Sequence, residues 1–173
     1  ASKKILESNM PFVSTVLANG VDLPAGEVIK STAYNVSVYE RFENGLIEGR
    51  FAKLDTGSAD LLDASATPKI IGIVKRKITG EIGTGVYATS GLGIDQVAEI
   101  IDFGWATVTV TSAAVPTKLA PVYAINLNTA EAGKATQDSA ASGAVIVPDT
   151  VFWEAKAPGV WLVRISRFLT GAA

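Results

Sequence analysis

The sequence predicts a mainly β protein, built as a single β-sandwich or barrel-like (jelly-roll-like) domain with at most one short helix. Short runs rich in Val, Ile, Thr and aromatic residues recur along nearly the whole chain of 173 residues. Gly, Pro, Asn and Asp separate these runs, as tight turns require. Sustained helical periodicity is hard to find, and strands at this spacing are typical of a sandwich or barrel.

Six ranges have the pattern of strands. The clearest is Trp105–Thr111, where threonines alternate with Val108 and Val110, so we expect one face to lie on the core and the other to meet water. Five further ranges are predicted strands because they are rich in Val, Ile and aromatic residues: Asn35–Tyr39, Leu46–Leu54, Ile70–Ile78, Pro121–Ile125 and Val160–Phe168.

The segments between these strands have turn chemistry. Glu43–Gly45 contains the Asn-Gly pair of a tight hairpin, and Pro158-Gly159 precedes the last strand. The small, polar stretch Thr136–Gly143 is predicted to be a loop. The range Ile94–Ile101 fits a short helix, with its apolar residues on one side, and it fits an irregular edge strand equally well.

Residues 1–30 differ from the rest, because Asn9–Pro11 and Leu23–Gly26 break the chain before any sustained strand. We therefore expect an extended N-terminal arm over residues 1–30, followed by a β-rich domain over residues 31–173. Two hypotheses remain open for the arm: that it becomes ordered against a neighbouring chain, or that it folds along its own domain.

The composition excludes much chemistry. The chain has no cysteine and no histidine, which serine-histidine hydrolases, thiol nucleophiles and ordinary zinc sites need. Acidic residues are dispersed, so we expect no metal and no cofactor. Fifteen Lys and Arg against 17 Asp and Glu give a net charge of −2, so nucleic acid is not an expected partner. No apolar run approaches 18 residues, and no export signal begins the sequence, so we expect a soluble protein without a membrane partner.

The segment Leu54–Ser58 contains Asp-Thr-Gly-Ser, the form of an aspartic protease active-site turn. That chemistry needs two aspartates that share a proton, and the chain has one copy of the motif. A protease would therefore require a symmetric dimer that joins two Asp55 side chains. The same four residues also form an ordinary turn after a strand, which is the interpretation we favour.

Two further features have a structural and a binding interpretation. The triplet Lys75-Arg76-Lys77 is either a solvated strand edge or a docking contact for an acidic surface. The three tryptophans, Trp105, Trp153 and Trp161, lie in strand-like contexts, which favours burial or a subunit interface. Because only 18% of the residues are charged and 48% are apolar, partner chains are expected to cover part of the surface.

Seven segments follow one another in a characteristic order along the chain, although each alone is only a strand or turn signature. They are Tyr39–Ser58, Ser65–Val74, Gly104–Val110, Pro121–Tyr123, Gly133–Thr136, Val147–Trp153 and Gly159–Ile165. In this order, across roughly residues 35 to 167, they resemble the structural cement, or capsid decoration, proteins of tailed bacteriophages.

The resemblance implies a structural virion protein and not an enzyme. Such a protein binds the outer surface of the mature capsid, bridges subunits of the major capsid protein and associates with itself as a dimer or trimer. A tail- or fibre-associated binding module remains an alternative. The candidate capsid or subunit contacts are four residues of the arm, the basic triplet and one tryptophan: Lys3, Lys4, Ile5, Leu6, Lys75, Arg76, Lys77 and Trp153.

Overall fold

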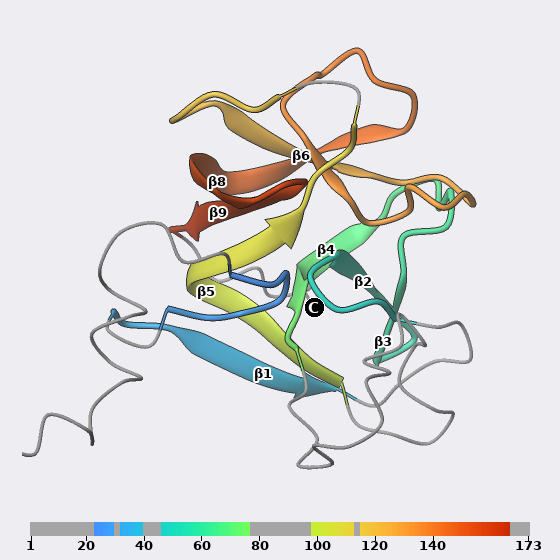
Figure 1. The fold of residues 1–173 in the computed structure, drawn as a ribbon. Coiled ribbons are helices and arrows are strands. Elements are labelled where there is room, and N and C mark those ends of the chain that lie inside the picture. Colours follow the sequence, from blue (N-terminus) through green and yellow to red (C-terminus); the bar gives the residue numbers. More distant parts are fainter. Residues whose placement is uncertain (1–22, 30–31, 40–45, 77–97, 113–114, 167–173) are drawn as a thin grey trace, which may run out of the picture.

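The computed structural model describes residues 23–29, 32–39, 46–76, 98–112 and 115–166. These residues form nine strands and no helix (Figure 1). The strands are β1 (Asn35–Tyr39), β2 (Phe51–Asp55), β3 (Ser58–Leu61), β4 (Lys69–Val74), β5 (Ala98–Thr109), β6 (Pro121–Ile125), β7 (Ala135–Thr136), β8 (Ala144–Ala157) and β9 (Val160–Ile165). The predicted fold class is confirmed. The described ranges contain no helix of the length and hydropathy needed to cross a membrane.

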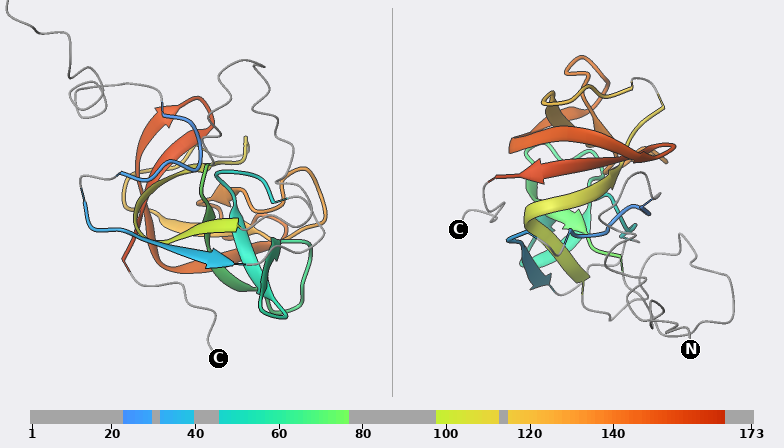
Figure 2. Two further views of the ribbon diagram at one scale, coloured as in Figure 1. Left: turned by 90° about the horizontal axis from the view of Figure 1, so that it is seen from below. Right: turned by 60° about the vertical axis from the view of Figure 1, so that its left-hand side comes forward.

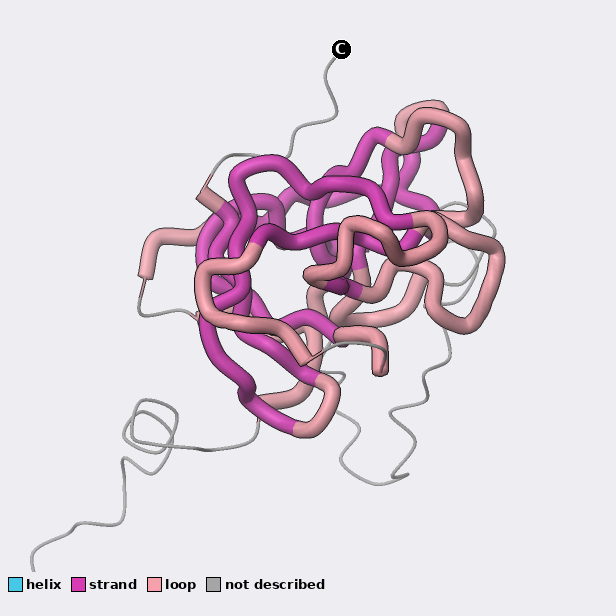
Figure 3. The backbone as a smooth tube through the Cα atoms, turned by 90° about the horizontal axis from the view of Figure 1, so that it is seen from above, coloured by secondary structure: helices cyan, strands magenta, loops and turns pink. Residues whose placement is uncertain are grey.

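One antiparallel sheet connects all nine strands, in the order β3-β2-β4-β5-β9-β8-β6-β7, with β1 paired to β5. The sheet curls around the core (Figure 3). It closes where Val110, just after β5, forms a parallel bridge to Ala135 of β7, and the Thr111 N–H donates to the Ala135 carbonyl at 2.9 Å. Strands β5, β9, β8, β6 and β7 therefore form a small barrel, which leaves few open edges.

Strand β5 changes its pairing partners along its length. The first half of β5 pairs with β1 and β4, and the second half, from Gly104 onward, pairs with β9. The long β8–β9 hairpin curls beside β5 (Figure 2). Gly104 lies at the change of partners with a φ of +106°, and a Cβ there would lie 2.7 Å from the Ala33 carbonyl oxygen. Only glycine fits both this dihedral and this close approach.

Two apolar clusters fill the interior. The larger lies within the barrel and has Phe51, Val108 and Phe152 among its members, all without solvent exposure. The smaller lies between β2, β4 and the start of β5, and includes Leu46 and Ile71. Val108 and Val110 thus face the core as predicted. The predicted water-facing side of the same strand is wrong at Thr107, which is fully buried.

Thr107 is buried because residues 23–29 lie along the outer edge of β5. The Gly26 N–H donates to the Thr107 carbonyl, and the Thr107 N–H donates to the Glu27 carbonyl, each at 2.9 Å. The Thr107 hydroxyl donates to the Pro24 carbonyl at 2.6 Å. The end of the predicted arm is therefore folded along its own domain, while residues 1–22 lie outside the described residues.

Several predicted boundaries differ from the structure. The ranges Asn35–Tyr39 and Pro121–Ile125 match β1 and β6, whereas the strand predicted from Leu46 begins at Phe51, after a turn at Gly49. Of the ambiguous range Ile94–Ile101, residues 98–101 belong to β5 and residues 94–97 lie outside the described residues. The predicted turn at Glu43–Gly45 also lies outside them, and the turn at Pro158-Gly159 is confirmed.

Two buried polar networks stabilise the sheet from within. Lys53, which is 6% exposed, lies 3.6 Å from the Asp60 carboxylate and donates hydrogen bonds to Asp63 and to the Ser65 hydroxyl. Burial lowers the pKa of Lys53, but the hydrogen bond that Lys53 donates to Asp63 and the charges of Asp63 and Asp60 outweigh burial and raise the pKa above its ordinary value. The same hydrogen bond lowers the pKa of Asp63.

The second network attaches β1 to β5. Asp102, which is 1% exposed, accepts a hydrogen bond from the Ser37 hydroxyl at 2.5 Å and one from the Asn35 side-chain amide at 2.8 Å. Burial raises the pKa of the neighbouring Tyr39, and the charge of Asp102 raises it further. The carboxylate is thus buried with hydrogen-bond partners, which offsets the cost of removing it from water.

Candidate docking surface

Two tryptophans meet on the outside of the barrel, across strand β9. The centroids of the Trp105 and Trp153 rings lie 4.9 Å apart, and the ring planes are inclined by 82°, so the pair packs edge to face. The Lys118 ammonium lies 3.8 Å from the centroid of the Trp153 ring, in the range of a cation–π interaction. Both indoles remain partly exposed. We refer to Trp105, Trp153 and Lys118 as the tryptophan surface.

The strand register explains how residues 48 positions apart form this pair. Trp105 pairs with Arg164 of β9, and Arg164 pairs with Val151 of β8, so these side chains share the outer face of the sheet. The register of β8 shifts between Phe152 and Glu154, where a bulge changes the direction of Trp153.

Trp161 does not belong to this surface. Its ring meets the buried Phe152 ring edge to face, at a centroid distance of 5.8 Å, and it packs against the larger core cluster. One tryptophan therefore supports the core, whereas Trp105 and Trp153 lie together on the outside. The three tryptophans are thus divided between the core and the outer face of the barrel.

The loop that carries Lys118 is fixed on both sides. Its Leu119 N–H donates to the Phe152 carbonyl at 2.8 Å, and the Gln137 side chain accepts from the Thr117 N–H at 2.8 Å. Leu119 has a φ of +67°, which is strained for leucine, yet its side chain is 60% exposed, and Val115 is 80% exposed. Strained backbone conformations cluster at functional sites, so this loop is a candidate part of a contact surface.

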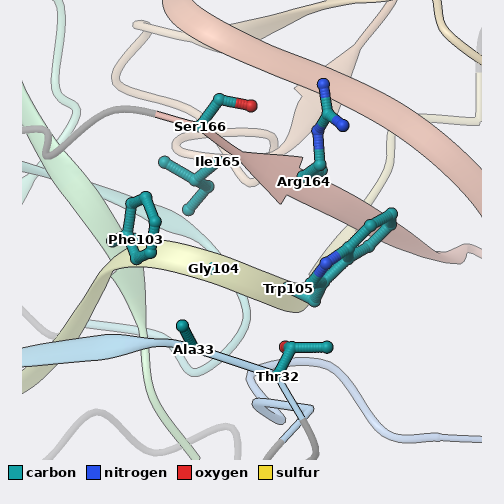
Figure 4. Close-up of a pocket in the computed structure, with 8 residues that line it drawn as sticks. All are labelled: Thr32, Ala33, Phe103, Gly104, Trp105, Arg164, Ile165 and Ser166. Carbon is teal, nitrogen blue, oxygen red and sulfur yellow. The ribbon is translucent and has the colours of Figure 1, made fainter.

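A groove of about 360 Å³ opens beside Trp105, where β5 bends at Gly104 (Figure 4). Residues 32 and 33 form one wall and residues 164–166 the other. Figure 4 shows Phe103 and Ile165 on one side of the groove and Trp105 on the other, with Arg164 on the neighbouring strand β9, where it pairs with Trp105. The Arg164 guanidinium is exposed and has no hydrogen bond or ion pair with any residue in the described ranges.

The basic triplet is only partly described, and one of its charges is already matched. Lys75 forms an ion pair with Glu99 of β5 at 2.5 Å. The Arg76 N–H donates to the Gly26 carbonyl at 2.8 Å, which holds residues 23–29 in place. Lys77 and the arm residues Lys3, Lys4, Ile5 and Leu6 lie outside the described residues, so their role as contacts stays a prediction. Of the predicted contacts, the structure thus places Trp153 on the tryptophan surface.

Asp55 ends strand β2 at a two-residue hairpin. Asp55 pairs with Ser58 of β3, and the connecting Thr56 and Gly57 have φ values of +46° and +91°, as in a type I′ turn. The Asp55 carboxylate accepts a hydrogen bond from the Thr56 hydroxyl at 3.0 Å. The segment therefore has the geometry of the structural turn. Among the described residues, no group of three or more Asp and Glu side chains could hold a metal ion.

Residues 12–167 match the family described as "XM1 gp53 minor capsid protein". A solved structure, "The capsid of Myoviridae Phage XM1", contains a chain that is 66% identical, with a TM-score of 0.76 over 92% of this chain and 99% of that one. Among curated proteins no match is found. The resemblance to capsid-associated proteins of tailed phages is thereby confirmed. The chain belongs to the XM1 gp53 minor capsid protein family.

Proposed function

We propose that this protein decorates the outer surface of the mature phage head and cements it by bridging subunits of the major capsid protein. The observation that carries the proposal is the tryptophan surface on the outside of a closed barrel. Trp and Arg are the residues most enriched at the energetic centres of protein interfaces, and truncating one there typically costs about 2–4 kcal/mol of binding free energy.

The fold suits a passive structural role. The closed barrel presents the tryptophan surface on strands and on a loop with hydrogen bonds at both ends, so little conformational entropy is lost on binding. Many copies on one head add modest interfaces into a resistant shell. Self-association as a dimer or trimer is part of the proposal, because each bridging unit then contacts more than one capsid subunit.

Catalysis is not part of the proposal. Asp55 lies at the tip of a hairpin turn, where its carboxylate accepts a hydrogen bond from the next residue. The protease alternative requires a second Asp55 from another copy, and it is tested by peptide cleavage with wild type and with Asp55→Asn. Cleavage that disappears in the variant would establish it. The capsid-protein relative favours a place on the head over the tail module.

The proposal is tested with phage heads made with and without the protein. Heads without it should assemble but release their DNA at a lower temperature, and adding purified protein should restore the wild-type release temperature. A virion map should show the barrel on the outside of the shell. Density inside the head, or equal release temperatures with and without the protein, contradicts the proposal.

Two variants test whether the tryptophan surface is the part of the protein that contacts the head. Trp153→Ala should bind heads at least about 30-fold more weakly, which corresponds to about 2 kcal/mol. Val38→Ala removes an exposed apolar side chain from β1, on the other half of the molecule, and should bind as wild type does. Equal losses in both variants argue against a contact centred on the tryptophan surface.

A further inference from the structure

The groove beside Trp105 and the charge of Arg164 point to the chemistry of the partner. We propose that they bind an extended segment of the major capsid protein that carries an aspartate or glutamate next to an apolar side chain. This inference rests on the proposed function and adds the recognition chemistry of the docking surface. Three observations carry it. The groove has an apolar lining, Arg164 has no ion-pair partner among the described residues, and a second cation, Lys118, lies beside the tryptophan pair.

The groove accepts an apolar side chain. Its inner surface comes from Ala33, Phe103 and Ile165, with the backbone of Gly104 between its two walls. Its volume of about 360 Å³ lies at the lower end of the range of about 300–1,000 Å³ that is typical of sites for small ligands, so it holds one or two side chains and not a large cofactor. Because the groove is open to the surface, a chain can lie across it without unfolding the barrel.

Arg164 supplies the polar half of the recognition. Three other cations in the described ranges pair with carboxylates: Lys75 with Glu99, Lys134 with Glu131, and Lys156 with Glu154. The Arg164 guanidinium has no such partner among the described residues, and Arg164 is the residue of β9 that pairs with Trp105. A carboxylate that docks there can accept two parallel hydrogen bonds from the guanidinium.

Lys118 is a second cation on this surface that has no ion-pair partner among the described residues. Its ammonium lies over the Trp153 ring and forms no ion pair with a described residue. Two cations, Arg164 and Lys118, therefore lie beside the tryptophan pair, in a protein whose net charge is −2. Opposite charges across an interface set the partner and its register, so the complementary segment is acidic.

The tryptophans strengthen this recognition by removing water. When a partner covers Trp105, the adjacent ion pair with Arg164 loses its solvent, and a charge-assisted hydrogen bond is stronger in such surroundings. An extended chain projects alternate side chains to the same side, at about 6.6 Å intervals. One such side chain can enter the groove while the carboxylate of the residue two positions away, on the same side of the chain, reaches the guanidinium.

The test measures binding of purified protein to heads that lack it, for wild type, Arg164→Glu, Arg164→Lys and Lys69→Glu. We expect Arg164→Glu to bind at least about 30-fold more weakly, and Arg164→Lys, which keeps the charge but loses the planar fork, about tenfold more weakly. Lys69→Glu makes the same change of charge at an exposed position on β4 and should bind within about twofold of wild type. Circular dichroism and melting temperatures confirm that each variant is folded.

A second variant tests the apolar half. Ala33→Phe fills the groove from its wall and should weaken binding about tenfold while Arg164 stays in place. In the major capsid protein, one acidic residue changed to lysine should restore binding of Arg164→Glu, which identifies the bound segment.

The possible outcomes separate this inference from the proposed function. If wild type fails to bind heads, the proposed function fails, and the inference fails with it. If wild type binds but Arg164→Glu binds equally well, or if Lys69→Glu weakens binding as much, the inference alone is overturned. If Arg164→Glu instead dissociates an oligomer of the isolated protein, the occupant of the groove is a second copy, which also overturns it.

Discussion

The buried Lys53 network allows the most quantitative prediction about stability. The change is Lys53→Met, which keeps an unbranched side chain as far as the ε position and removes the ammonium. Asp60 is 2% exposed, so its carboxylate is left with a hydrogen bond from the Leu61 N–H at 2.7 Å but with no cation from Lys53. Removing one partner of a buried ion pair typically costs about 3–5 kcal/mol, because the remaining charge stays out of water.

The assay is thermal and urea unfolding followed by circular dichroism. For a chain of this length, each kcal/mol shifts the melting temperature by about 2–4 °C, so Lys53→Met should melt about 6–20 °C below wild type. As a control, Lys134→Met breaks the more exposed pair with Glu131, three residues away on the chain, and should cost less than about 1 kcal/mol.

A triple variant separates the lost ion pair from lost packing. Lys53→Met with Asp60→Asn and Asp63→Asn removes all three charges, and it should recover at least half of the loss, since a neutral replacement leaves no buried charge. The reasoning is refuted if Lys53→Met costs no more than Lys134→Met, or if the triple variant is the less stable of the two.

Two further predictions concern the bend of β5 and the acid limit of stability. Gly104→Ala should lose more than about 1 kcal/mol, because a Cβ at a φ of +106° also meets the Ala33 carbonyl oxygen at 2.7 Å. Gly57→Ala, at a φ of +91° with open space around its Cβ, should lose less, and urea unfolding ranks the two. The pKa of Asp63 is lowered in the folded state, so its contribution is present above the unfolded value of about 3.9 and is lost as pH falls through the folded value. Asp63→Asn should therefore be less stable than wild type at pH 7, and melting temperatures should show that the difference disappears in acid; a difference that persists at pH 2 would contradict this cause.

The sequence predicted the strands that depend on local pattern. Asn35–Tyr39 and Pro121–Ile125 are short runs of β-branched and aromatic residues, and their bounds were correct. Strand β8 was not predicted as a whole, because Pro148, Asp149 and the charged residues near its end interrupt the apolar pattern. Its continuity depends on pairing with both β6 and β9, and Asp149 has a φ of +50° within it. Tertiary pairing there outweighs local propensity.

The candidate site was predicted only in part. Trp153 was named as a contact, but its pairing with Trp105 depends on the register across β9 and on a bulge that no local pattern indicates. Arg164 and Lys118 were missed because single cations carry no motif. Trp105 itself gave a signal. In a strand with alternating faces, Ala106, Val108 and Val110 share the core face, so Trp105 lies on the opposite face.

The shared strand β5 has a mechanical consequence. A force that enters at its first half, through β1 and β4, passes along one continuous chain into the ladder with β9, which pairs six residues from Gly104 to Thr109. Because sheet hydrogen bonds run across the strands, tension along β5 strains the whole ladder in shear and does not open it bond by bond. If the protein bridges two capsid subunits as we propose, a load along β5 is therefore shared by the six residue pairs of this ladder, which fail together and not one after another.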